Sequence, residues 1–112
     1  MPVRVVVDTT EGHVWIRAAG ELDVSSAAGL QRTGEDALAD GHDVVLLDLS
    51  GILFLDSTGL GVLIALHRSA LAHDAHLAVV AASTAVRRVV ELMGAGHVLA
   101  LHETVEDAVG RR

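Results

Sequence analysis

The stretch that decides the fold is DVVLLDL, residues 43–49. Four consecutive apolar residues occupy its centre, and no polar residue alternates with them. A run of this kind is typical of a strand that protein covers on both faces, as in the middle of a parallel sheet. We therefore predict a buried parallel strand at the centre of an α/β fold.

Downstream of this strand, the apolar spacing predicts helices that alternate with strands. A helix is expected over residues 57–73, with an inward face of Leu60, Leu63, Ile64, His67 and Leu71. A buried strand follows at 76–82. Ser83 or Thr84 then caps a third helix that ends at Gly94, with an apolar stripe of Val86, Val89, Val90 and Met93. A short strand at 97–102 and a terminal helix opened by Thr104 and Asp107 complete the pattern.

Upstream, two strands are expected at residues 3–7 and 13–19. The tight turn between them predicts an antiparallel hairpin. Ser25 and Ser26 are expected to cap a helix that runs to about residue 39 and stops at Gly41, with Ala27, Leu30, Gly34 and Leu38 facing inward. The fold class is therefore α/β: one domain over residues 1–112, with an N-terminal hairpin and a mixed, mostly parallel sheet.

Composition and charge exclude several classes of function. The net charge is −7 and all eight basic residues are arginine, so the chain offers no basic face for direct nucleic-acid binding. There is no cysteine to form a disulfide or a thiolate metal site. No apolar run approaches the ~20 residues that span a bilayer. The first residues lack the apolar core of a signal peptide, so a cytoplasmic protein without membrane association is expected.

The segment FLDSTGLG, residues 54–61, is where the sequence departs from simple packing. It follows the most buried strand, at the sheet edge where parallel α/β folds place their sites. In the simplest interpretation, Ser57 or Thr58 caps the next helix. However, Gly59 and Gly61 together sacrifice up to ~2 kcal/mol of helix propensity. Bare glycines let a partner approach closely, and a serine at a helix N-terminus suits phosphorylation.

A second polar segment, GELD at residues 20–23, ends the predicted hairpin. Taken alone, it is an ordinary polar strand exit followed by the Ser25 cap. If the two neighbouring helices flank the same sheet edge, Glu21 and Asp23 lie near Asp56. Several carboxylates around one serine would form an acidic rim that suits a basic partner.

The residues fit no catalytic or metal-binding pattern. Leu55 stands where a G-x-S-x-G nucleophile elbow requires glycine, and the chain has no lysine for a P-loop. Two residues separate Asp56 from Gly59, where an aspartic protease has one. The seven histidines lack the H-E-x-x-H spacing and are interpreted as scattered surface or core-edge residues. We expect a non-enzymatic protein with no metal and no cofactor.

GELD and DSTGLG together, at this separation, resemble the STAS-domain anti-sigma factor antagonists of bacteria. The likeness covers nearly the whole chain and includes the D-L-S run at 48–50 and the L-M-G ending of the third helix. It implies partner switching. The unphosphorylated protein binds an anti-sigma factor, which releases its sigma factor; the anti-sigma factor is also a serine kinase that phosphorylates Ser57; and a metal-dependent phosphatase of the PP2C type restores the active form.

The resemblance also implies the residues of the partner-binding surface, which are Glu21, Asp23, Asp56, Ser57, Thr58, Gly59, Leu60 and Gly61. Asp23 is expected to contact the kinase or orient the site, and Thr58 is a second candidate acceptor. One alternative is a STAS module in another assembly, such as a stressosome component or a transporter subunit. Another, less favoured, is a nucleotide-binding protein or small hydrolase, which tight ATP or GTP binding would reveal.

Overall fold

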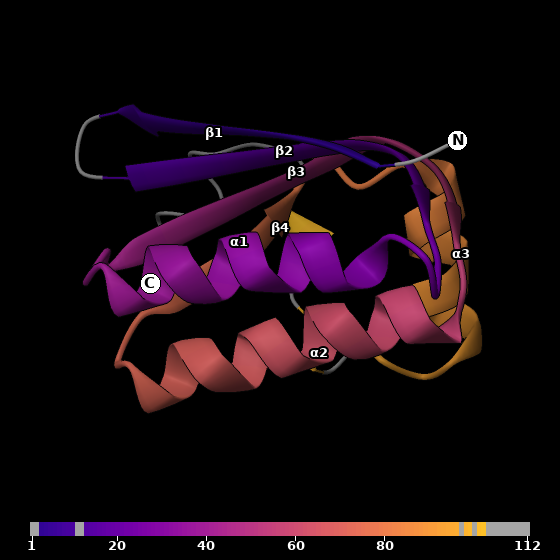
Figure 1. The fold of residues 1–112 in the computed structure, drawn as a ribbon. Coiled ribbons are helices and arrows are strands. Elements are labelled where there is room, and N and C mark those ends of the chain that lie inside the picture. The colour runs from indigo at the N-terminus through magenta and orange to yellow at the C-terminus, as the bar shows by residue number, and fades with distance from the viewer. Residues whose placement is uncertain (1–2, 11–12, 97, 100, 103–112) are drawn as a thin grey trace.

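A computed structural model describes residues 3–10, 13–96, 98–99 and 101–102. Five strands and three helices follow one another along this part of the chain (Figure 1). They are β1 (Arg4–Thr10), β2 (His13–Leu22), α1 (Ala27–Ala39), β3 (Val44–Leu55), α2 (Ser57–Ala72), β4 (His76–Val80), α3 (Thr84–Leu92) and β5 (Leu101–His102).

The strands form one five-stranded sheet in the order β1-β2-β3-β4-β5. β1 and β2 pair antiparallel, and every later pair is parallel. This topology confirms the predicted α/β class, the N-terminal hairpin and the central parallel strand. β3 is longer than expected, since it continues past residue 49 and pairs with β2 as far as Leu55, through two register shifts. Because of these additional paired residues, both strands end at the same edge of the sheet.

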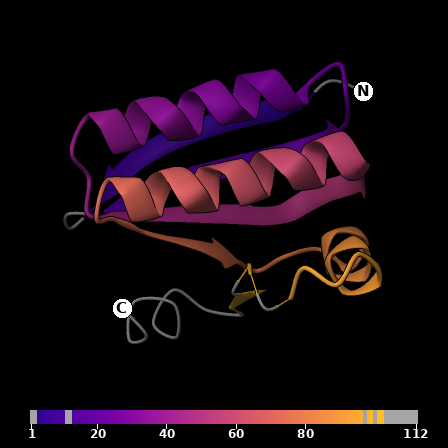
Figure 2. The ribbon, with the colours of Figure 1, turned by 90° about the horizontal axis from the view of Figure 1, so that it is seen from below.

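Helices α1 and α2 lie side by side over one face of the sheet (Figure 2). Gly34 permits their close approach, because a Cβ there would lie 2.6 Å from Cδ2 of Leu66. The predicted inward face of α1 is confirmed. The predicted face of α2 is partly wrong: Leu60 and Leu63 are buried, but Ile64 and His67 are half-buried and Leu71 is exposed. Leu66 and Ala70 are buried instead, because α2 packs against α1 as well as the sheet.

The C-terminal elements agree with the sequence less closely. α3 begins at the predicted cap, where the Ser83 hydroxyl accepts a hydrogen bond from the backbone N–H of Val86. Val86 and Val90 are buried, but Met93, predicted to share their stripe, is exposed because the helix ends at Leu92 and Gly94 turns the chain at φ +66°. Of the described residues in the predicted last strand, 98–99 and 101–102, β5 covers Leu101–His102. The predicted helix after Thr104 lies outside the described residues.

Candidate functional site

The two polar segments meet at the carboxyl ends of β2 and β3. The parallel register pairs Glu21 with Phe54 and Leu22 with Leu55. Beyond the last pair, the Asp56 N–H donates to the Leu22 carbonyl at 3.3 Å. α1 and α2 both start at this edge and cover the same face (Figures 1 and 2). The two helices thus flank the same sheet edge. The sequence analysis expected GELD to lie beside DSTGLG on this condition.

Asp56 is the N-cap of α2. Its Oδ1 accepts a hydrogen bond of 2.9 Å from the Gly59 N–H, and its own carbonyl accepts the first helical bond, from Leu60. The interpretation in which Ser57 or Thr58 caps this helix is therefore wrong. An aspartate in extended conformation is among the strongest N-caps, so the helix needs no second one. The hydroxyls of Ser57 and Thr58 are therefore not needed to cap the helix.

Ser57 is the first residue of α2, and its side chain is exposed. Its hydroxyl has no hydrogen-bond partner among the described residues. The backbone N–H groups of Ser57 and Thr58 likewise have no acceptor within the described chain, as expected for the first turn of a helix. The site thus presents an unused hydroxyl next to unpaired N–H donors. A phosphate group fits such a place, because free N–H groups and the helix dipole both favour negative charge.

The two glycines of the motif have different roles. A Cβ on Gly59 would lie 2.5 Å from the Leu22 carbonyl oxygen and 2.6 Å from Leu55 Cδ1. Internal packing against β2 therefore accounts for glycine at position 59 without a partner, and a role of Gly59 in partner binding stays a prediction. Gly61 is exposed, and a Cβ there would meet nothing within 4 Å. Leu60 is only 4% exposed, so its side chain belongs to the core and is not available to a partner.

The carboxylate of Asp23 organises the loop between β2 and α1. Its Oδ1 accepts hydrogen bonds from the Ser25 hydroxyl at 2.7 Å and the Ser25 N–H at 3.0 Å. These bonds lower the pKa of Asp23, with a smaller contribution from Ser26, so the group is a carboxylate at neutral pH. Ser26 occupies the N-cap position of α1, but its hydroxyl donates to the Glu21 carbonyl rather than capping the helix. Asp23 thus shapes the loop that borders Asp56.

An apolar hollow of about 220 Å³ adjoins the serine. Its lining consists of Leu55, Asp56, Ser57, Val89, Leu92 and Met93. The sequence did not assign the last three to the site, because their helical spacing indicates only a packed helix. Their place beside Ser57 follows from the docking of α3 against β3, which joins segments far apart in the chain.

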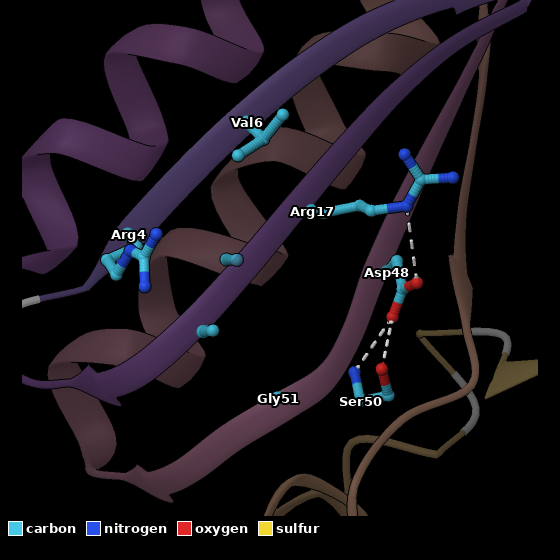
Figure 3. A pocket seen from close by; sticks show the side chains of 8 residues that line it. Arg4, Val6, Arg17, Asp48, Ser50 and Gly51 are labelled. Atoms are coloured by element: carbon cyan, nitrogen blue, oxygen red, sulfur yellow. Dashed lines mark hydrogen bonds and ion pairs between the residues drawn. The ribbon is translucent and has the colours of Figure 1, made fainter.

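A second hollow, of about 300 Å³, lies between β1, β2 and β3 and contains none of the predicted site residues (Figure 3). Arg17 lines this hollow. Its Nε lies 3.7 Å from Oδ2 of Asp48, and its Cζ lies 4.8 Å from the centroid of the Trp15 ring. Asp48 in turn accepts from the N–H and hydroxyl of Ser50. Arg17, Asp48 and Ser50 thus interact with one another just before the shift in register between β2 and β3.

Neither a membrane span nor a metal centre is found in the part of the chain that the structure describes. None of its helices is long and apolar enough to cross a bilayer. Nor does it bring three or more potential metal-ligating side chains into one cluster.

The sequence matches the STAS domain family over residues 4–108, so the chain belongs to that family. It is 31% identical to the anti-sigma-F factor antagonist RsfB of Mycobacterium tuberculosis, over 96% of this chain and 87% of the relative. An anti-sigma factor antagonist from Mycobacterium paratuberculosis has the same fold, with a TM-score of 0.85, 28% identity and coverage of 97% and 92% of the two chains. Within the STAS family, the chain thus belongs to the anti-sigma factor antagonists, which are regulatory proteins and not enzymes.

SpoIIAA of Bacillus, also an anti-sigma factor antagonist, shares this fold at 24% identity. Its unphosphorylated form has a TM-score of 0.77, with coverage of 96% of this chain and 95% of SpoIIAA. Its phosphorylated form has a TM-score of 0.71, with coverage of 96% and 98%. The fold described above therefore occurs in a protein with and without a phosphate group.

We predict opposite effects on stability for alanine at the two glycines of the motif. Gly59→Ala should lower the free energy of unfolding by about 1–3 kcal/mol, because the new methyl group overlaps the Leu22 carbonyl. Gly61→Ala should raise it by up to ~1 kcal/mol, because alanine favours the helix and the added carbon meets open space. Urea unfolding followed by circular dichroism measures both. Equal stability of the two variants would contradict the packing described for Gly59.

A second prediction concerns the cap. Asp56→Ala should lower the free energy of unfolding by about 0.5–2 kcal/mol, because the Gly59 N–H loses its acceptor. Asp56→Asn should retain most of the stability, since an asparagine side chain also accepts this bond. Thermal unfolding of both variants beside the wild type tests the assignment. An alanine variant as stable as the wild type would show that Asp56 is not the effective cap.

Proposed function

We propose that the protein is a cytoplasmic anti-sigma factor antagonist that phosphorylation of Ser57 switches off. Unphosphorylated, it binds an anti-sigma factor that is also a serine kinase, and the sigma factor is released. The same kinase transfers the γ-phosphate of ATP to the Ser57 hydroxyl, and the complex dissociates. A phosphatase of the PP2C type hydrolyses the phosphoserine and restores binding.

The observation that carries this proposal is that Asp56, and not Ser57, caps α2. Asp56 supplies the cap, so the adjacent Ser57 hydroxyl is exposed and makes no bond that the fold needs. Serine is a favoured N-cap, but Ser57 stands one residue past the cap, so capping does not explain its presence. Membership of the anti-sigma factor antagonists supports the same assignment, because it makes an anti-sigma factor the expected partner.

Electrostatics provides the switch. A phosphate on Ser57 adds about 1.5–2 negative charges next to the carboxylate of Asp56, near a loop that holds the ionised Asp23. In the free protein, water and the unpaired N–H groups of the first helical turn stabilise this charge, so the fold persists. In a closed interface the added charge is desolvated beside like charge, and each 1.4 kcal/mol of cost weakens binding about tenfold. No rearrangement of the fold is needed.

The first test is phosphorylation. The histidine-kinase-like ATPases of the source genome are purified, and each is incubated with this protein and ATP. We expect at least one to place a single phosphate on Ser57, located by peptide mass spectrometry, and to leave Ser57→Ala unmodified. Thr58→Ala is the matched control and should be phosphorylated as the wild type is. If every ATPase is active on another substrate but none modifies Ser57, the switch is wrong and the interaction-module alternative gains.

The second test is binding. Ser57→Ala should bind the same ATPase with unchanged affinity and stay bound in the presence of ATP, because its interface cannot acquire charge. Ser57→Asp should bind at least about tenfold more weakly, a cost of ~1.4 kcal/mol. Calorimetric titration measures both. An aspartate variant that binds as tightly as the wild type would contradict the electrostatic account.

A further inference from the structure

Exposed large hydrophobic side chains occur near the edge of the sheet where Ser57 lies, and two of them, Leu92 and Met93, line the same hollow as Ser57. Among the described residues, five of the eight that are exposed lie in segments that end at this edge of the sheet, whereas two lie in β1 and one near the far end of α2. The five are Val24 at 76% exposure, Leu53 at 68%, Phe54 at 48%, Leu92 at 77% and Met93 at 60%. Exposed apolar side chains that cluster at one place mark an interaction surface.

Leu92 and Met93 are held in place by the way α3 ends. The Ala95 N–H bonds the Val90 carbonyl at 2.9 Å, and Gly94 has a positive φ, as in a Schellman ending. This turn buries Ala95 together with Val86 and Val90 of the same helix. The two exposed side chains therefore project from an anchored helix end and not from a free loop. Figure 1 shows α3 at the edge of the sheet where β3 leads into α2.

The hollow between these side chains and Ser57 has walls of two kinds. Leu92, Met93 and Val89 form the side from α3, and Leu55, Asp56 and Ser57 form the opposite side. Ser57 lines this hollow, so the hollow is continuous with the interface proposed above. Most of the lining is apolar, but Asp56 contributes a carboxylate, and the ionised Asp23 lies on the adjoining loop. An apolar side chain complements the apolar part of this lining.

We infer that the anti-sigma factor kinase anchors itself by inserting an apolar side chain into this hollow, so that the end of α3 is part of its docking surface. The inference rests on the proposed function and adds a region that the motif residues do not include. It assigns the two tasks of the interface to different groups. Burial of the apolar side chain against Leu92 and Met93 supplies affinity, because fully desolvated pockets carry most of the binding energy of an interface. Ser57 on the opposite wall supplies control.

The arrangement also explains how one phosphate can release a whole partner. A phosphorylated Ser57 would place a strongly hydrated dianion at the wall of an apolar pocket. Filling the pocket would then require removal of water from the phosphate, which is costly unless a cation pairs with it. The phosphate and the apolar anchor therefore exclude each other.

The test compares Leu92→Ser and Met93→Ser with Leu71→Ser. Leu71 is 63% exposed near the far end of α2 and is the matched control, since all three changes remove an exposed apolar side chain. Affinity for the ATPases named above is measured by calorimetric titration without ATP. We expect Leu92→Ser and Met93→Ser to weaken binding about tenfold, and Leu71→Ser to change it by less than about twofold. Met93→Leu, which keeps an apolar side chain of similar volume, should bind as the wild type does.

Phosphorylation kinetics provides a second readout. If α3 anchors the kinase, Leu92→Ser and Met93→Ser should raise the KM for phosphorylation of Ser57 and leave kcat unchanged, because the hydroxyl and the α2 residues that position it are not altered. Circular dichroism and thermal unfolding confirm that each variant is folded.

The outcomes separate this inference from the proposed function. Normal phosphorylation of Ser57, with equal affinity of all three serine variants, overturns the inference and leaves the proposed function standing. If the wild type binds an ATPase but is not phosphorylated, the proposed phosphorylation switch is wrong. The comparison of the serine variants still tests the docking surface. If no ATPase binds, both fail. If the α3 variants alter self-association in sedimentation velocity and not binding of the ATPase, the occupant is a second copy of this chain and the inference is wrong.

Discussion

The parallel pairing of β2 with β3 is the constraint on which the site depends. It runs from His13 opposite Val44 to Leu22 opposite Leu55, so both strands end at the same edge. The backbone bond from Asp56 to the Leu22 carbonyl then joins the two following loops. Gly59 continues this contact into α2, where only a residue without a Cβ fits against the same carbonyl. Without this registered pair of strands, GELD and DSTGLG would be two unrelated polar segments.

Near the start of α2, some polar side chains make hydrogen bonds that the fold uses and others do not. Asp56 caps the helix, and Asp23 and Ser26 hold the loop before α1. Ser57 is the side chain between them that the fold leaves unused. This separation allows a modification of Ser57 to alter the surface without loosening the structure. The same fold occurs in SpoIIAA with and without phosphate.

The family to which the chain belongs and the apolar surroundings of Ser57 both point to protein recognition. The family concerns recognition of a regulatory protein. We propose that the hollow beside Ser57, bounded by the end of α3, gives that recognition a physical basis in apolar burial. In the proposed mechanism, affinity and control thus reside in adjacent but distinct side chains.

The sequence by itself determined the local features. The uninterrupted run VVLL of β3, the tight hairpin turn and the alternation of strands and helices predicted the topology, because covering both faces of a strand leaves a direct mark in composition. The DSTGLG motif located the site. Tertiary structure decided which residue caps α2, why Gly59 is glycine, which face of α2 is buried and that Leu92 and Met93 border Ser57. Each of these depends on contacts between segments distant in the chain: Gly59 with Leu22, α2 with α1, and α3 with β3. Periodicity within one segment reports that a face is apolar, but what that face meets is decided only when the segments pack.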